Sequence, residues 1–119
     1  MEKLAKREEQ IMRVFWKIKK AFVKEVVAEL PEPKPHYNSV ATMVRILEEK
    51  GFLDHHTFGK TFQYFPIVSE DRYKDLLVNS VVDKYFDKSY SKMIAHFAKE
   101  EKITEADLKR ILKRIKSRQ

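Results

Sequence analysis

Residues 35–51 read PHYNSVATMVRILEEKG, and this stretch decides the fold. After Tyr37, apolar side chains recur at steps of three and four residues, which predicts a helix with one face against a core. These side chains are Val40, Met43, Val44 and Leu47. Gly51 stands where a glycine commonly ends a helix. The opposite face has a second row at the same spacing, made of Asn38, Thr42, Arg45 and Glu49.

This outer row begins with small polar groups and lacks the Lys/Glu pairs of an ordinary solvated helix. Asn pairs with adenine, Thr contacts a thymine methyl or a phosphate, and Arg reaches guanine or phosphate. Taken alone, the stretch is more simply an ordinary surface helix, but its neighbours in the chain favour a DNA-reading role. The residues expected to contact DNA are Lys34, His36, Tyr37, Asn38, Ser39, Thr42, Arg45 and Lys60.

The expected roles within this set differ. The start of a reading helix enters the major groove first, so the expected base contacts are Asn38, Ser39 and Thr42. Three alternatives stay open: Ser39 capping the helix, Tyr37 packing or touching a phosphate, and Arg45 contacting the backbone instead of a base. The expected phosphate contacts, which position a protein without reading sequence, are Lys34, His36 and Lys60.

Two helices are expected before this one. The first covers residues 6–18, and the second covers residues 22–30 with Phe22, Val26, Val27 and Leu30 inward. Three prolines then make PEPKPH a stiff, extended connector to the third helix. Three short helices with a polar last one are typical of a helix-turn-helix core, here with a longer turn.

After Gly51 the hydrophobic period changes from helical to alternating, as in TFQYFPIV. Two strand-like runs around Gly59 predict a β-hairpin, because Gly59 supplies the backbone freedom of its turn. Three helices followed by a hairpin make a winged helix, with Lys60 at the wing tip. This core is expected to be complete before Ser69.

Residues 1–68 are therefore expected to form a winged-helix DNA-binding domain, and residues 69–119 a helical dimerisation domain. Ser69 caps a helix reaching about Phe86, a short helix follows, and Thr104-Glu-Ala-Asp107 is a capping box for the last one. Their apolar stripes exceed what three short helices cover, so pairing with a second copy is expected. The expected dimer contacts are Leu77, Val81, Tyr85, Met93, Phe97, Leu108, Ile111 and Leu112.

Composition narrows the function classes. A chain of 119 residues with 43% hydrophobic and 36% charged residues is typical of a soluble globular protein. No apolar run approaches the roughly 20 residues of a membrane span, and the charged amino terminus lacks the apolar core of a signal peptide. We therefore expect a cytoplasmic protein without membrane contact. The net charge of +7 favours a polyanionic partner.

No metal site, cofactor or enzymatic activity is expected. The chain has no cysteine, which excludes disulfides and thiolate ligands. His55 and His56 are adjacent on a strand and point to opposite faces, while His36 and His96 fall in different domains. Neither a paired-carboxylate motif, a Gly-rich phosphate loop nor a nucleophile motif occurs.

Three segments carry a resemblance to a known family. KREEQIM, PKPHYNSVATMVRILEEKGFL and the wing FGKTFQYFPIVSE resemble the penicillinase-repressor family (BlaI/MecI type) of winged-helix transcriptional repressors. The distal YFDKSYSKMIAHFAKEEKITEADLKRILKRI resembles that family's dimerisation domain, so the resemblance covers nearly the whole chain. It implies a homodimeric repressor that occupies a palindromic operator in double-stranded DNA.

The resemblance also implies an inducing protease or sensor, whose cut in the distal domain breaks the dimer. In the family the cut falls in a stretch ending Asn-Phe, and this chain departs from that pattern with His96-Phe97. A copper-responsive branch carries paired cysteines, which are absent here. Two other functions stay open. One is a winged-helix protein-interaction module without DNA binding; the other, RNA binding, is disfavoured because the aromatic residues fall on core stripes.

Overall fold

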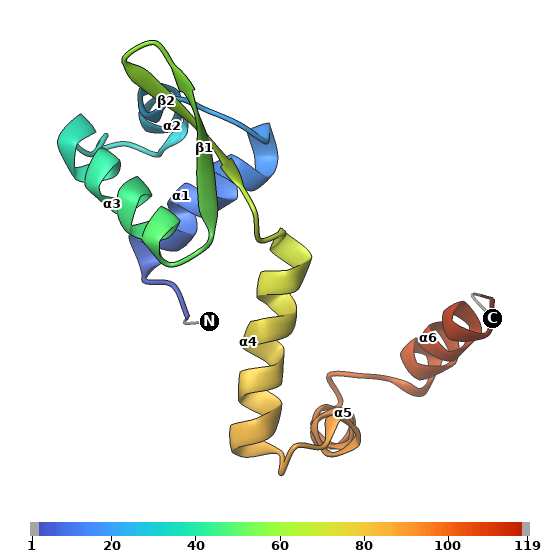
Figure 1. The fold of residues 1–119 in the computed structure, drawn as a ribbon. Helices are drawn as coiled ribbons and strands as arrows, with labels where there is room; N and C mark the ends of the chain where they lie inside the picture. Colours follow the sequence, from blue (N-terminus) through green and yellow to red (C-terminus); the bar gives the residue numbers. More distant parts are fainter. Residues whose placement is uncertain (1–2, 118–119) are drawn as a thin grey trace. The chain divides into compact units, whose positions relative to one another are not determined.

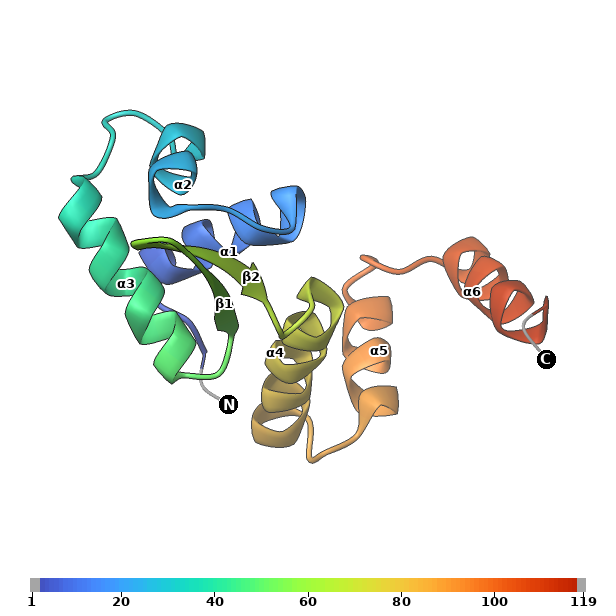
Figure 2. The ribbon, with the colours of Figure 1, turned by 45° about the horizontal axis from the view of Figure 1, so that its top comes forward.

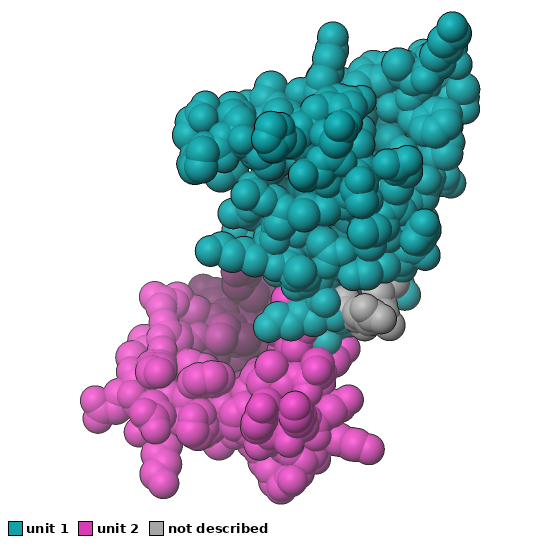
Figure 3. Space-filling view, turned by 90° about the vertical axis from the view of Figure 1, so that its left-hand side faces the viewer, with its two compact units in different colours: residues 1–76 teal, residues 77–119 magenta. Residues whose placement is uncertain are grey.

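A computed structural model describes residues 3–117, which form six helices and a two-stranded antiparallel sheet (Figure 1, Figure 2). The elements are α1 (Lys6–Ile18), α2 (Val23–Glu29), α3 (Tyr37–Glu49), β1 (Leu53–Phe58), β2 (Thr61–Pro66), α4 (Glu70–Tyr85), α5 (Tyr90–Lys99) and α6 (Glu105–Ser117). This confirms the predicted fold class, mainly helical with one small hairpin. The chain divides into two compact units, residues 1–76 (unit 1) and residues 77–119 (unit 2), shown in Figure 3.

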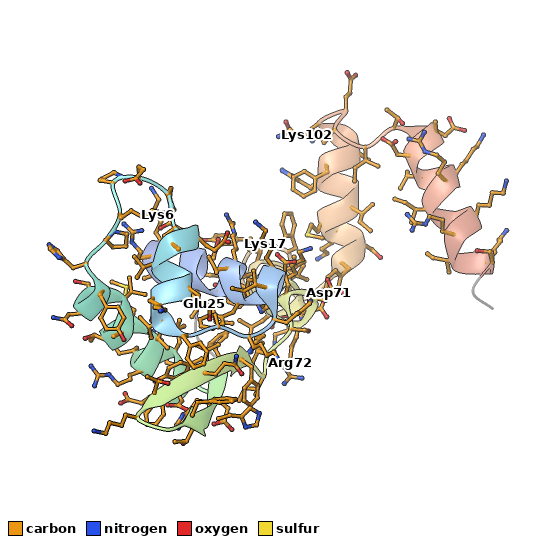
Figure 4. All side chains as sticks on the ribbon, turned by 90° about the horizontal axis from the view of Figure 1, so that it is seen from above. Lys6, Lys17, Glu25, Asp71, Arg72 and Lys102 are labelled. Carbon is orange, nitrogen blue, oxygen red and sulfur yellow. The ribbon has the colours of Figure 1, made fainter. Side chains whose placement is uncertain are left out.

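The first helix has the predicted bounds, whereas the second is shorter than predicted. Phe22 precedes α2 as its cap residue, because the Glu25 carboxylate (labelled in Figure 4) accepts the Phe22 backbone N–H at 2.8 Å. Phe22 and Val27, both predicted to face inward, are half-buried, and Val23, which the sequence reading did not place inward, is buried. Val26 and Leu30 are buried as predicted.

The third helix buries three of the four residues of the predicted stripe, Met43 being half-buried, and Gly51 follows its end. Val40, Val44 and Leu47 are fully buried in it. The Gly51 N–H donates to the Glu48 carbonyl at 3.0 Å and the Phe52 N–H to the Leu47 carbonyl at 2.9 Å. These two bonds make a Schellman motif, and the Gly51 φ of +84° is the left-handed conformation that the motif requires.

The hairpin has the predicted turn. Strands β1 and β2 pair from Leu53 opposite Pro66 to Phe58 opposite Thr61, which leaves Gly59 and Lys60 as a two-residue loop. Gly59 has a φ of +61°, as the first central residue of a type II′ turn does. The hairpin is also joined to the segment before α2, because Ala21 and Tyr64 exchange two backbone hydrogen bonds of 2.9 Å.

The core of unit 1 extends into the first turns of α4. Tyr73 is buried, and its ring lies 5.8 Å from both Trp16 and Phe52, measured between ring centroids. The Tyr73 hydroxyl accepts the buried backbone N–H of Leu4 at 2.8 Å. The expectation that this core is complete before Ser69 is therefore wrong, since Tyr73 is one of its members. The division into a DNA-binding domain of residues 1–68 and a dimerisation domain of residues 69–119 stays a prediction.

Helices α4 and α6 begin at the predicted caps, whereas α5 begins at Ser89, a cap that the sequence analysis did not predict. Ser69 and Ser89 accept backbone N–H groups of α4 and α5 through their hydroxyls, and Thr104 and Asp107 form the reciprocal capping box of α6. Val82 alone is buried among residues 77–117. Unit 2 thus has very little core of its own. Within residues 3–117, no helix combines the length and the apolar character that crossing a membrane demands.

Candidate DNA-binding surface

The outer row of α3 is exposed along its whole length. Asn38, Thr42, Arg45 and Glu49 all lie on the solvent side, opposite the buried stripe. Tyr37 is 55% exposed at the first position of the helix, and Ser39 beside it is exposed as well. The five predicted contacts on this helix are thus all exposed, namely Tyr37, Asn38, Ser39, Thr42 and Arg45.

The beginning of α3 suits an anion. Its cap residue is His36, and no side chain in the described part of the molecule caps the helix. Ser39 lies three positions inside the helix start, so it is not the cap that the sequence left open. The first turn holds no acidic residue. The first backbone N–H groups of a helix lack partners inside it and carry a partial positive charge, which favours a phosphate oxygen.

Thr42 uses part of its polar capacity within the helix. Its hydroxyl donates to the Asn38 carbonyl at 2.9 Å. The oxygen lone pairs and the methyl group remain available, which suits contact with a thymine methyl or a donor group on a base edge. Across residues 3–117 the Asn38 side-chain amide has no hydrogen bond, so both its donor and its acceptor side are available.

Lys60 lies in the hairpin turn and is exposed. Figure 1 and Figure 2 both show the hairpin turn toward the same end of unit 1 as the start of α3. The edge-on contact of Phe58 with Phe22, at 5.8 Å between centroids, ties the wing to the beginning of α2. A cation at the wing tip and a polar helix start at one end of the unit can meet one polyanion together.

Two predicted contacts at the linker have different surroundings. The Lys34 ammonium group donates to the carbonyls of Ala28 and Leu30, at 2.5 and 2.7 Å, where α2 ends. It therefore stabilises the end of α2, a role that the sequence reading did not consider. His36 is exposed next to the start of α3, as a phosphate contact needs.

The wing carries exposed aromatic side chains. Phe58 and Phe62 are 52% and 43% exposed, so the expectation that aromatic residues fall on core stripes is wrong for the wing.

His55 stacks on Phe62 at 4.1 Å between centroids, and its Nδ1 lies 2.5 Å from Glu48 Oε2. Burial first, and then the Glu48 charge, raises the pKa of the neighbouring Tyr64 hydroxyl above its ordinary value of 10.0.

The predicted dimer contacts stay largely uncovered in the single chain. Leu77, Met93 and Phe97 are half-buried, and the other five are exposed, namely Val81, Tyr85, Leu108, Ile111 and Leu112. Ile94 and Ile115, outside the predicted set, are also exposed. The His96-Phe97 pair lies inside α5, where both rings contact Phe86.

A three-helix core, a two-stranded wing and an accessible polar third helix define the class of winged-helix proteins. The chain belongs to the penicillinase repressor family, whose sequence profile matches residues 4–117. It is 26% identical over 98 residues to the penicillinase repressor of Bacillus licheniformis, covering 82% of this chain and 77% of that protein.

Two further comparisons agree with membership of the penicillinase repressor family. The methicillin resistance regulatory protein MecI of Staphylococcus aureus (strain N315) is 21% identical over 109 residues, which cover 91% of this chain and 89% of MecI. Among solved structures, the DNA-binding domain of the repressor BlaI superimposes with a TM-score of 0.52 and 32% identity, over 61% of this chain and 94% of that domain. The resemblance read from the wing and the third helix is thereby confirmed at the level of the family.

Proposed function

We propose that the protein is a transcriptional repressor that binds a palindromic operator as a homodimer, with α3 in the major groove and the wing on the DNA backbone. The observation that carries the proposal is the exposed polar row of α3. The row starts at a helix end that no side chain of residues 3–117 caps, and the hairpin turn with Lys60 lies toward the same end of unit 1. Membership of a repressor family supports the same function.

The residues divide by role. Asn38, Ser39 and Thr42 lie in the first turns of α3, where base edges are met in helix-turn-helix complexes. His36 and Lys60 flank them and are proposed to contact phosphates, which fix the register of the protein. Lys34 is proposed to act mainly through the end of α2, because its ammonium group is already bound to two carbonyls.

The homodimer is supported by unit 2. Among residues 77–117 only Val82 is buried, yet three helices present isoleucine, leucine, valine and tyrosine side chains to solvent. A second copy would cover these side chains, and two-fold symmetry would then present two identical α3 helices to two half-sites. Release by a protease is left out of the proposal, since His96 stands where the family pattern has Asn.

The test is selection of duplex fragments from a random pool by the purified protein, followed by gel shifts on the selected sequence across a salt series. We expect a palindromic sequence, and an affinity that falls linearly with the logarithm of salt concentration. A scrambled duplex and a single-stranded RNA of equal length are the controls. Failure to retain duplex DNA at low salt would contradict the proposal and favour a protein-interaction module.

A further inference from the structure

Three potential metal ligands meet where α3 joins β1. Glu48 comes from the last turn of α3, and Asp54 and His55 come from the start of β1. One ligand atom from each, two carboxylate oxygens and an imidazole nitrogen, lie within 4.8 Å of one another. We propose that this cluster binds a first-row divalent cation of the Zn²⁺ type.

The donor set determines which ion fits. Imidazole nitrogen with carboxylate oxygen suits Zn²⁺ and its transition-metal neighbours, whereas Ca²⁺ and Mg²⁺ prefer six or more oxygen ligands. Two carboxylates balance the charge of a divalent ion, and the imidazole binds it in the neutral form. Three protein ligands leave a position for water, as in open zinc sites.

The histidine ring is already held in place. It stacks on Phe62 at 4.1 Å and is tilted against Tyr64 at 5.5 Å, measured between ring centroids. Its Nδ1 faces Glu48 Oε2 at 2.5 Å. Little side-chain entropy is then lost on binding, because the ring that supplies the nitrogen ligand is packed before the ion arrives.

Asp54 reaches the same place although neighbours on a strand point to opposite faces. Its Oδ1 accepts the backbone N–H of His55 at 2.8 Å, which turns the carboxylate along the strand toward His55. The cation takes the position between His55 Nδ1 and Glu48 Oε2, and the proton shared there is released to solvent. The two atoms must separate from 2.5 Å, since each metal–ligand bond is about 2.0–2.2 Å long.

The site has a consequence for DNA binding that rests on the proposed function. The ion would join the end of the reading helix to the first strand of the wing, and these are the two elements proposed to contact DNA. Metal occupancy would then fix the angle between helix and wing and change operator affinity. Metal binding itself is independent of whether the protein binds DNA.

The first experiment measures metal binding without DNA. Untagged, metal-free full-length protein competes with a chromophoric indicator for Zn²⁺, beside the variants Glu48→Gln, His55→Ala and His56→Ala. His56 is the matched control, because it is the adjacent histidine and stacks on Phe65 on the other face of the hairpin. We expect one equivalent bound by the wild type and by His56→Ala, and affinity at least tenfold weaker in the other two.

Two results would overturn the proposal: no competition by the wild type, or losses in His56→Ala as large as in His55→Ala. Circular dichroism checks folding, and if His55→Ala unfolds, Glu48→Gln decides, since its amide keeps the shape and removes the charge. Operator affinity is then measured with and without Zn²⁺. A protein that binds Zn²⁺ but no duplex DNA refutes the proposed function and leaves the metal site standing, whereas unchanged operator affinity refutes only the coupling.

Discussion

Asn38 and Thr42, one turn apart on α3, are both proposed to contact bases, yet their side chains have different groups available. The Thr42 hydroxyl is engaged with the Asn38 carbonyl, whereas the Asn38 amide is available. We expect Asn38→Ala and Thr42→Ala each to cost about 1–3 kcal/mol at one particular base pair and so to relax specificity. Binding to operator duplexes with single base changes measures this. Glu49→Ala, on the same row but at the far end of the helix, is the control, and unchanged discrimination in both variants would show that the reading face is misassigned.

Lys60 is expected to contribute affinity without specificity. Its position in the hairpin turn suits a phosphate contact, and a phosphate contact carries no sequence information. Lys60→Ala should therefore weaken binding to all duplexes alike and lower the salt slope by roughly one unit. Lys113→Ala is the control, because it removes the same charge from an exposed position on α6. A loss of affinity confined to some sequences, or an unchanged salt slope, would contradict a phosphate contact by Lys60.

Glu8 connects α1 to the end of α3. Burial alone would raise the pKa of Glu8, but hydrogen bonds from Lys50 and the Ala5 N–H, with the Lys50 charge, outweigh it and lower the pKa from its ordinary value of 4.5. The folded-state pKa is depressed, so this stabilisation is present above about pH 4.5 and is lost as the pH falls through the folded-state pKa.

Glu8→Gln should lower the free energy of unfolding by about 1–3 kcal/mol at pH 7 and by less at acid pH. Urea unfolding at both pH values measures the difference. Glu9→Gln is the control, because Glu9 pairs with Arg13 at the surface and such pairs contribute about 0–1 kcal/mol. A loss of equal size at both pH values would mean that the carboxylate charge is not what stabilises this contact.

At the scale of single elements, α4 belongs to two units. Its first turns close the winged-helix core through Tyr73, and its last turns carry Val82. Tyr73→Phe leaves the buried Leu4 N–H without its acceptor, which should cost about 1–3 kcal/mol. Urea unfolding followed by the fluorescence of Trp16, the single tryptophan, reports on this core. Tyr85→Phe is the control, since that ring is 69% exposed, and an equal loss in both variants would argue against the role of Tyr73.

Element ends could be predicted where a local side chain or glycine marks them. Ser69, Ser89 and the Thr104–Asp107 pair cap helices within three residues of themselves, and Gly51 ends α3 through its own backbone. Such signals depend only on nearby residues, so a sequence reveals them. The start of α2 is less evident from the sequence, because the aromatic cap residue Phe22 has no polar group to mark it, and only the Glu25 carboxylate signals the helix start.

The candidate sites also contain residues whose position the sequence predicts and residues whose position depends on how the chain packs. Helical periodicity alone predicts that Asn38, Thr42 and Arg45 face solvent, because the opposite stripe is apolar. The Lys34 contacts depend on the path of the linker, and the cluster of Glu48 with His55 depends on how α3 packs against β1. Comparing histidines only with one another misses that cluster, since its other ligands are carboxylates.

At the scale of the whole molecule, unit 2 is the part whose apolar side chains are largely exposed in the single chain. Ile111 is half exposed although it lies on the apolar stripe of α6, so Ile111→Asp should leave the protomer folded and break a dimer through this surface. Sedimentation measures the mass, and circular dichroism measures the helix content. A full-length wild type that sediments as a monomer would contradict the proposed assembly.

Truncated chains test folding and assembly separately, and the structure shows at which residue the chain should end. A chain ending at Leu76 retains Tyr73 and should keep its winged-helix core, whereas a chain ending at Val68 exposes the rings of Trp16 and Phe52 and should be markedly less stable. The longer fragment should nevertheless bind operator far more weakly than the full chain, because two linked heads attach jointly and one head does not. Sedimentation and operator affinity at one salt concentration test this. If the fragment ending at Leu76 bound as tightly as the full chain, unit 2 would have no part in DNA binding. A homodimer would then not be needed to bind the operator.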